Sequence, residues 1–178
     1  AVLVKMFGVT GEWLYKVARG KGSLHVETER QQVKSIGHSI TFSEDSINTR
    51  FLEGTLYHLS EKVGRRARQK DLLGRTVTLK LRYADFKTLT RAVSVGEGTN
   101  WDMEIFEQAR RLMQPLLERR VRVRLLGVTL SKLRPADGQL TLFDPEAQKK
   151  QMQLYHSVDQ LRDKYGFEAV RKGPAVSF

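Results

Sequence analysis

The spacing of apolar residues separates the chain into extended and helical stretches. Apolar and small polar residues alternate from position 33 to 42, as in a strand with one buried face. From Ile47 to about Lys70 the apolar residues recur every three or four positions, which predicts one long amphipathic helix. Alternation returns at 75–83 and at 86–95. Only two residues separate these stretches, so we expect them to pair as an antiparallel hairpin.

A second helix and a last strand follow. Thr99 or Asn100 can cap a helix that ends near Leu116. The stretch 120–133 alternates in two halves, because the apolar residues of 121–125 and those of 128–130 have opposite parity. We expect a β-bulge at Leu126–Gly127 to restore the register.

The order strand, helix, strand, strand, helix, strand is that of the split βαβ fold. The predicted class is α+β: a four-stranded antiparallel sheet at 33–133, with both helices on one face. The other face should be uncovered, and its side chains are hydroxyls, glycine and cations, with no acid. They are Ser35, Gly37, Ser39, Thr41, Thr76, Thr78, Lys80, Arg82, Thr88, Thr90, Ser94, Arg120, Arg122 and Arg124.

Shorter segments flank this domain. Residues 1–20 contain two helical stretches separated at Gly8, and 21–32 are polar without periodicity, which predicts a linker. Residues 134–144 are loop-like, and within 145–178 the apolar spacing predicts a helix that Gly166 ends. Because the chain starts at Ala1 without an initiator Met, we expect a preceding N-terminal portion.

Composition and charge narrow the function. The 178 residues, 40% hydrophobic and 29% charged, suit one packed core with appendages. The 31 Lys and Arg against 20 Asp and Glu give a net charge of +11, which favours nucleic acid as partner, with an anionic membrane surface second. We expect no membrane span. The lack of cysteine excludes disulfides and cysteine zinc sites and fits a reducing cytoplasm, and the 4 histidines are too scattered to suggest a metal site.

The uncovered face indicates the mode of binding. Hydroxyls, amides and cations without carboxylates grip phosphate oxygens without reading bases, whereas a merely solvated face usually mixes charges of both signs. An RNA-binding split βαβ domain would instead carry aromatic side chains on its central strands, where this sequence has Thr, Lys and Arg.

Four segments carry a family resemblance: 7–20 (FGVTGEWLYKVARG), 34–37 (KSIG), 83–91 (YADFKTLTR) and 124–128 (RLLGV). Together they resemble Y-family translesion DNA polymerases of the bacterial polymerase IV (DinB) branch, over nearly the whole chain. Residues 34–37 resemble the opening of the family's little-finger domain, and residues 83–91 match its Tyr-x-Asp-Phe-x-x-x-Thr-Arg pattern. Residues 7–20 resemble the end of the family's helical thumb, and residues 124–128 resemble the last strand of the little finger.

The resemblance implies a little finger at 33–133, tethered flexibly to the thumb, whose sheet lies in the major groove of the template–primer duplex. It implies DNA contact by Lys34, Ser35, Thr90, Arg91 and Ser94, to which strand parity adds Arg122 and Arg124. For Arg91 the alternative is a salt bridge to a helix carboxylate.

The resemblance also implies that catalysis takes place elsewhere. Family polymerases hold two metal ions, expected to be magnesium, on palm carboxylates that would precede residue 1. We therefore expect no catalytic residue, metal or cofactor within this chain, and no DNA synthesis by it alone. The acids at 44–45 and 102–104 lie where helix N-termini explain them.

A second motif follows the last strand. Gln139-Leu140-Thr141-Leu142-Phe143 resembles the QLxLF peptide with which bacterial polymerases hold the sliding clamp. The Gln139 amide can form a hydrogen bond at the rim of a pocket on the clamp, while Leu142 and Phe143 fill the apolar pocket itself. The alternative is that Leu140, Leu142 and Phe143 pack back as a short fifth strand. The predicted helix that starts directly behind the motif favours presentation to a partner.

These features predict the DNA-binding little-finger region of an error-prone translesion DNA polymerase, which grips the duplex backbone and docks on the clamp during DNA repair and lesion bypass. The alternative is a non-catalytic, polymerase-related accessory protein in mutagenic DNA repair. The two differ in whether an upstream palm keeps its carboxylates. The expected partners are template–primer duplex and the bacterial sliding clamp, and we expect a monomer in the cytoplasm, at the nucleoid.

Overall fold

A computed structural model describes residues 2–22, 33–136 and 145–171. The chain divides into two compact units, Ala1–Gln32 and Val33–Phe178, here called unit 1 and unit 2. None of the described helices is long and apolar enough to cross a membrane.

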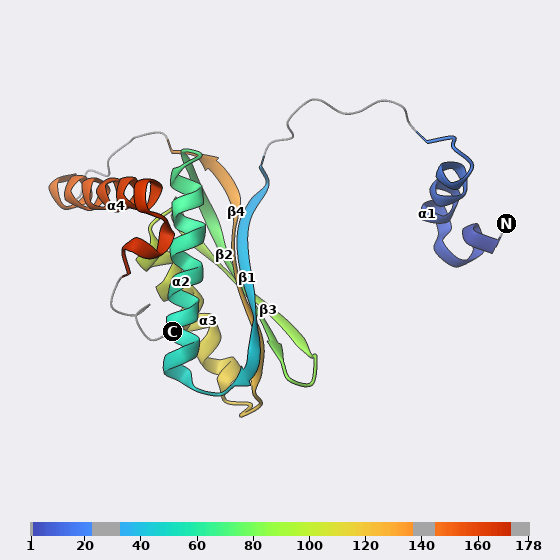
Figure 1. The fold of residues 1–178 in the computed structure, drawn as a ribbon, viewed down its shortest axis with the longest axis horizontal. Coiled ribbons are helices and arrows are strands. Elements are labelled where there is room, and N and C mark those ends of the chain that lie inside the picture. The colour runs from blue at the N-terminus through green and yellow to red at the C-terminus, as the bar shows by residue number, and fades with distance from the viewer. Residues whose placement is uncertain (1, 23–32, 137–144, 172–178) are drawn as a thin grey trace. The chain divides into compact units, whose positions relative to one another are not determined.

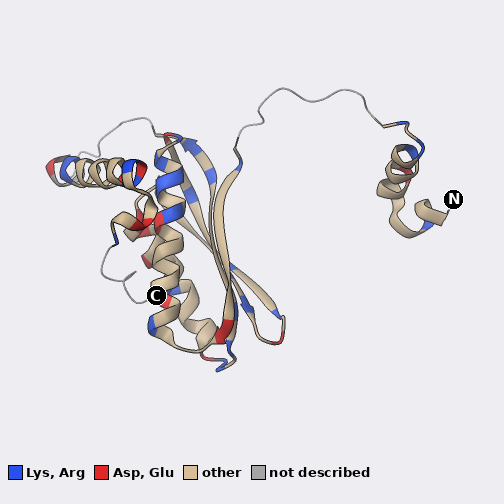
Figure 2. Ribbon diagram, viewed as in Figure 1, with Lys and Arg blue, Asp and Glu red and all other residues tan. Residues whose placement is uncertain are grey.

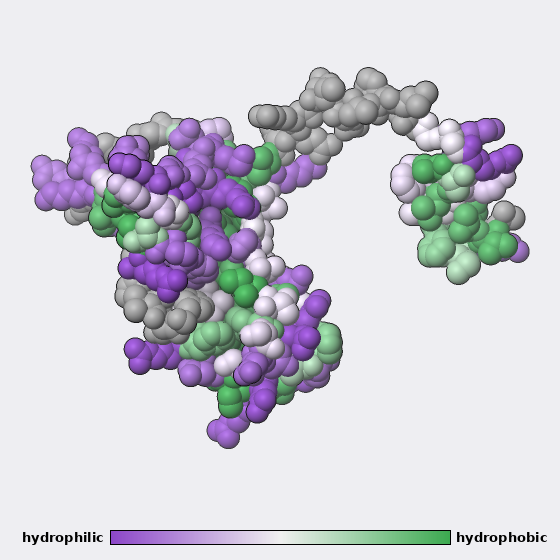
Figure 3. Space-filling view, in the orientation of Figure 1, coloured by the Kyte–Doolittle hydropathy of each residue, from purple (hydrophilic) through white to green (hydrophobic). Residues whose placement is uncertain are grey.

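The described part of unit 1 contains α1 (Val2–Ala18), which is interrupted at Gly8. The backbone there has φ 56° and ψ −132°, so the predicted break between two helical stretches is confirmed. A Cβ on Gly11 would lie 2.0 Å from the carbonyl oxygen of Leu3, so the two stretches cross closely at this glycine. Large apolar side chains remain exposed, including Trp13 (60%) and Val9 (86%), and Figure 3 shows this apolar surface.

Unit 2 is built on one antiparallel sheet with the strand order β1-β4-β2-β3. Its elements run, in chain order, β1 (Ser35–Ser46), α2 (Thr49–Arg68), β2 (Leu72–Tyr83), β3 (Thr88–Thr99), α3 (Asp102–Leu117), β4 (Val123–Pro135), α4 (Pro145–Tyr165) and a 3₁₀ turn (Phe167–Ala169). Helices α2 and α3 cover one face of the sheet (Figure 1). The predicted α+β fold is thus confirmed.

The core lies between that sheet face and the two helices. The inward row of β2 (Val77, Leu79, Leu81) is fully buried, as is the stripe of α2 that contains Leu52, Leu56 and Leu59. Burying each such side chain contributes about 1.5–3 kcal/mol. This packing fixes which face of the sheet remains for other contacts.

The caps of α2 and α3 differ. Asn48 caps α2, because its side chain accepts a hydrogen bond from the Phe51 N–H (3.2 Å). Neither residue predicted to cap α3 does so, since Trp101 occupies the N-cap position. The Thr99 hydroxyl instead accepts from the Trp101 N–H (3.0 Å), and the Asn100 amide donates to the Leu72 carbonyl (3.2 Å).

The β-bulge of the last strand lies two residues earlier than predicted. Arg82 pairs with Leu125 whereas Tyr83 pairs with Val123, so Arg124 is the extra residue. The prediction at Leu126–Gly127 was wrong because Leu125 and Leu126 are adjacent and equally apolar, and alternation does not show which one faces the helices. The structure buries Leu126 and leaves Leu125 on the other face.

Charged side chains join helix α4 to α2. The guanidinium of Arg68 bonds to Asp159 of α4 (2.7 Å) and to Asp102 of α3 (2.7 Å), and Arg65 pairs with Asp163. Burial opposes the charge of Arg68, yet the hydrogen bonds that it donates to the carboxylates of Asp159 and Asp102 raise its pKa above the ordinary value. Arg65 and Arg68 at the C-terminal end of α2 are thus held by ion-pair partners as well as by the helix dipole.

Candidate nucleic-acid interface

The sheet face away from α2 and α3 is formed by sixteen residues in four register rows. We call it the open face, and no described helix of unit 2 covers it. From the upper to the lower end of the sheet in Figure 1, the rows are Ser35–Ser131–Thr76–Ser94, Gly37–Thr129–Thr78–Ala92, Ser39–Gly127–Lys80–Thr90 and Thr41–Leu125–Arg82–Thr88.

The open face carries no acid. Hydroxyl-bearing residues fill most of its positions, two cations are added by Lys80 and Arg82, and none of the sixteen residues is Asp or Glu. Its glycines are required by close packing: a Cβ on Gly127 would lie 2.9 Å from the Ser39 Cβ, and one on Gly37 would lie 2.6 Å from the Thr129 hydroxyl.

The predicted uncovered face left out Thr129 and Ser131. The predicted register turned Val128 and Leu130 inward, so it already implied outward positions for these two hydroxyls, although they were not included. With the bulge at Arg124, the alternation beyond it places both hydroxyls outward. The acidic residues of β1 lie beyond the paired rows, at its C-terminal end (Figure 2).

The structure places the predicted DNA contacts at different positions. Ser35, Thr90 and Ser94 belong to the open face, and exposed Lys34 directly precedes β1. Arg91 pairs with Leu79 and so belongs to the row on the helix side of the sheet. Its guanidinium donates to the Thr90 carbonyl (3.0 Å), and the described residues show no ion pair between it and a helix carboxylate.

Arg122 and Arg124 flank the rows instead of belonging to them. Arg122 precedes β4, and its carbonyl accepts from the Ala84 N–H (2.8 Å). Arg124 is the bulge residue: its guanidinium lies over the Phe86 ring (4.8 Å) and 3.6 Å from an Asp45 oxygen. The sequence pattern had placed both arginines on the uncovered face by simple alternation along one strand. In the structure Arg122 lies before the strand, and the bulge at Arg124 interrupts the alternation. DNA contact by all seven named residues stays a prediction.

The turn between β2 and β3 is held rigidly beside these arginines. Asp85 accepts from the Lys87 N–H (3.0 Å) and pairs with Arg119 (2.7 Å), which lies over the Tyr83 ring. The Lys87 N–H, together with the Arg119 guanidinium, lowers the pKa of Asp85. Phe86 is left exposed (64%).

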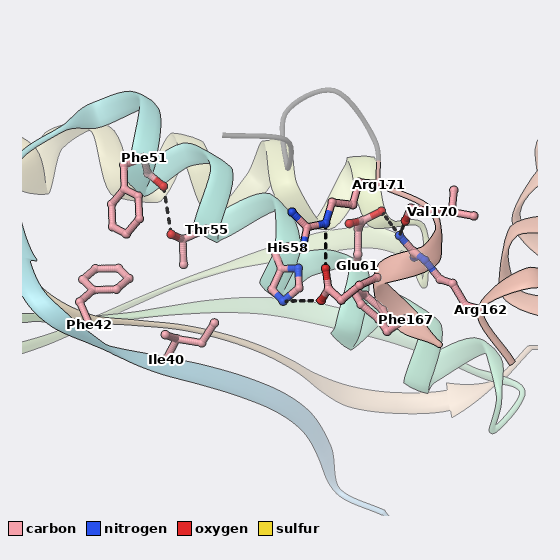
Figure 4. A pocket seen from close by; sticks show the side chains of 11 residues that line it. Ile40, Phe42, Phe51, Thr55, His58, Glu61, Arg162, Phe167, Val170 and Arg171 are labelled. Atoms are coloured by element: carbon pink, nitrogen blue, oxygen red, sulfur yellow. Dashed lines mark hydrogen bonds and ion pairs between the residues drawn. The ribbon is translucent and has the colours of Figure 1, made fainter. Parts of the chain in front are cut away.

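A pocket of about 260 Å³ lies on the helix side, between β1, α2 and the 3₁₀ turn (Figure 4). Ile40, Phe42 and Phe51 line one end. At the other, the Glu168 carboxylate lies between two basic groups, 3.9 Å from His58 and 3.0 Å from Arg171. The pocket is separate from the open face. No group of three or more His, Asp or Glu able to hold a metal occurs among the described residues.

The predicted clamp-binding residues, Gln139, Leu140, Leu142 and Phe143, lie outside the described residues. Clamp binding and the fifth-strand alternative both stay predictions. The described chain stops at Ala136, whose N–H donates to the Asp71 carbonyl (2.8 Å), and resumes at α4.

Comparison with known proteins places this fold in a family. Residues 33–142 match the impB/mucB/samB family C-terminal domain. A DNA polymerase IV of Desulfatibacillum aliphaticivorans is 38% identical over 96% of this chain and 44% of its own length. One of Brucella melitensis is 36% identical over 98% of this chain and 39% of its own length. The chain thus spans about two fifths of the curated relatives it matches.

Among solved structures, the Y-family DNA polymerase chimera Dbh-Dpo4(243-245)-Dbh matches 73% of this chain and 37% of its own, with 25% identity and a TM-score of 0.50. The domain match covers the whole sheet of unit 2 together with α2 and α3. The chain therefore belongs to the impB/mucB/samB family of Y-family DNA polymerases, whose C-terminal domain it carries at residues 33–142.

Proposed function

We propose that unit 2 holds the backbone of template–primer duplex DNA against its open face, as part of a lesion-bypass DNA polymerase. The observation that carries this proposal is the absence of any Asp or Glu among the sixteen open-face residues, on a face that no described helix of unit 2 covers. A surface of hydroxyls, backbone and cations suits phosphate oxygens, which DNA of every sequence presents alike.

The chemistry of the surface favours backbone contact over base reading. Its side chains are short apart from Lys80 and Arg82, and its aliphatic members are Ala92 and Leu125. Stacking platforms for single strands use aromatic side chains, and none of the sixteen is aromatic. Duplex of any sequence is therefore the ligand that the surface fits best.

We propose that nucleotidyl transfer takes place outside these residues. Polymerases hold two metal ions on clustered carboxylates, and the described residues bring no such cluster together. In the proposed polymerase, bond formation belongs to other parts of the protein, and this region binds the duplex backbone. A non-catalytic accessory protein would use the same grip, so the carboxylates of the upstream palm decide between the two.

Docking on a sliding clamp is the second part of the proposal. Its support is the Gln139–Phe143 motif, which offers a polar group and apolar anchors in the order that a peptide pocket requires. Leu142→Ala with Phe143→Ala should abolish capture by the bacterial clamp while duplex affinity stays unchanged. Retained capture would remove this assignment.

The salt dependence of duplex binding tests the first part. If Lys34, Lys80, Arg82, Arg122 and Arg124 each meet one phosphate, the slope of log K against log salt should be about −4 to −5. Affinity should then fall roughly several hundred-fold between 50 and 200 mM salt. Lys80→Ala with Arg122→Ala should reduce the slope by about 2.

The matched control is Arg110→Ala, on helix α3, which removes one cation from the opposite layer of unit 2. It should leave the slope unchanged. An affinity that does not depend on salt, or an equal effect of Arg110→Ala, would refute backbone binding by the open face.

A further inference from the structure

Arg124 stands apart from the other arginines at this end of the sheet. The guanidinium of Arg119 is fixed by Asp85 at 2.7 Å, and Arg82 donates to the Thr88 hydroxyl at 2.8 Å. Arg124 lies 3.6 Å from Asp45, which is longer than a hydrogen bond. Its side chain is 39% exposed and that of Asp45 is 21% exposed, so another anion can reach the pair.

Phe86 supplies the second contact of Arg124. The guanidinium carbon lies 4.8 Å from the centre of the Phe86 ring, within the range of a cation–π interaction. The ring is otherwise open to solvent (64% exposed), so the core gains little from its placement. Its main neighbour among the described contacts is this cation.

The backbone forces Phe86 into that position. Phe86 has φ 63°, a left-handed conformation that is costly for a bulky residue. Three hydrogen bonds hold the turn: Phe86 N–H to the Tyr83 carbonyl (3.0 Å), Tyr83 N–H to the Lys87 carbonyl (3.0 Å) and Ala84 N–H to the Arg122 carbonyl (2.8 Å). The last one ties the turn to the chain two residues before Arg124.

We propose that Phe86 and Asp45 preset Arg124 for the duplex backbone, with Phe86 as a positioning residue and Asp45 as an exchangeable placeholder for a phosphate. This rests on the proposed function. The ring holds the planar guanidinium in place, and the loose carboxylate holds its charged edge until a phosphate takes over. A phosphate has the same sign of charge and the same fork of oxygens as the carboxylate it replaces.

The two residues should act in opposite directions on duplex affinity. Phe86→Ala removes the positioning ring and should weaken binding about two- to five-fold. Phe86→Leu keeps apolar bulk without a π face and should behave like Phe86→Ala, whereas Phe86→Tyr should restore the wild-type value. Asp45→Asn removes the competitor and should strengthen binding about two- to five-fold.

Removing any acid helps a polyanion to bind, so Glu44→Gln is the matched control. It deletes the same charge one residue earlier on β1, at an exposed position. Its effect on duplex affinity should stay below about two-fold, because an exposed charge is screened by salt. An equal gain from Glu44→Gln and Asp45→Asn would overturn the placeholder role.

The decisive measurement is a double-mutant cycle in the full 178-residue chain, with a fluorescent blunt duplex at 100 mM salt. In the Arg124→Ala background, Phe86→Ala and Asp45→Asn should lose their effects, since both act through Arg124. Additive effects would overturn the inference while the proposed function stands. A wild-type chain without salt-dependent duplex binding would instead refute the proposed function itself.

Discussion

Replacing Arg162 by methionine should destabilise unit 2 more than any exposed arginine substitution. Arg162 of α4 and Glu61 of α2 form an ion pair of 2.7 Å in which both side chains are 1% exposed. The guanidinium also lies 4.3 Å from the Phe167 ring and donates to the Val170 carbonyl (2.8 Å). Breaking a buried pair by removing one partner costs roughly 3–5 kcal/mol, because the remaining charge stays in a low dielectric.

A double variant separates the cost of breaking the pair from its net contribution. Arg162 Nε and Nη1 have no hydrogen-bond partner among the described residues, so this buried guanidinium is only partly satisfied. Desolvation therefore offsets much of the Coulombic attraction. Arg162→Met combined with Glu61→Gln should recover more than half of the loss.

Urea unfolding followed by circular dichroism measures the free energy of unfolding of the single and of the double variant. The control is Arg171→Met, which breaks an exposed i,i+3 pair with Glu168 and should cost below about 0.5 kcal/mol. If Arg162→Met and Arg171→Met were equally mild, the docking of α4 through this buried pair would be refuted.

Two further predictions concern unit 2. Burial, followed by the Lys62 charge, lowers the pKa of His58, so below pH 6.5 the unfolded chain binds the extra proton and stability falls on acidification. His58→Gln should flatten that loss between pH 7.5 and 5.5 in urea titrations, and an unchanged slope would contradict it. Gly127→Ala would press a methyl group against the Ser39 Cβ at 2.9 Å, which should cost about 1–3 kcal/mol and lower the melting temperature. An unchanged melting temperature would show that the sheet does not pack this closely.

Periodicity predicted most of the fold because each element carries a local signal. In β2 every second residue is apolar, which requires one buried face, and the structure buries Val77, Leu79 and Leu81 completely. The bulge escaped prediction because two neighbouring leucines satisfy either register. Which of them is buried depends on pairing with β2, a contact distant in sequence.

The role of the cations on α2 could not be predicted either. Arg68 meets Asp159, which lies 91 residues later, and no local pattern links the two. The helix dipole accounts for the position of some of the cations at the C-terminal end of α2, but the structure adds ion pairs that anchor α4. In contrast, the hydroxyls and cations of the open face follow directly from alternation, because outward positions on a regular strand are fixed once the inward ones are known.

Protection of a thiol by duplex tests most directly whether the open face holds DNA. The chain has no cysteine, so Ser39→Cys on β1 and Gln114→Cys on α3 each introduce one alkylation site, the first on the open face and the second exposed on the helix side. Saturating duplex should slow alkylation at position 39 by about ten-fold or more and leave the rate at position 114 unchanged. Equal rates at position 39 with and without duplex, or protection confined to position 114, would contradict the account.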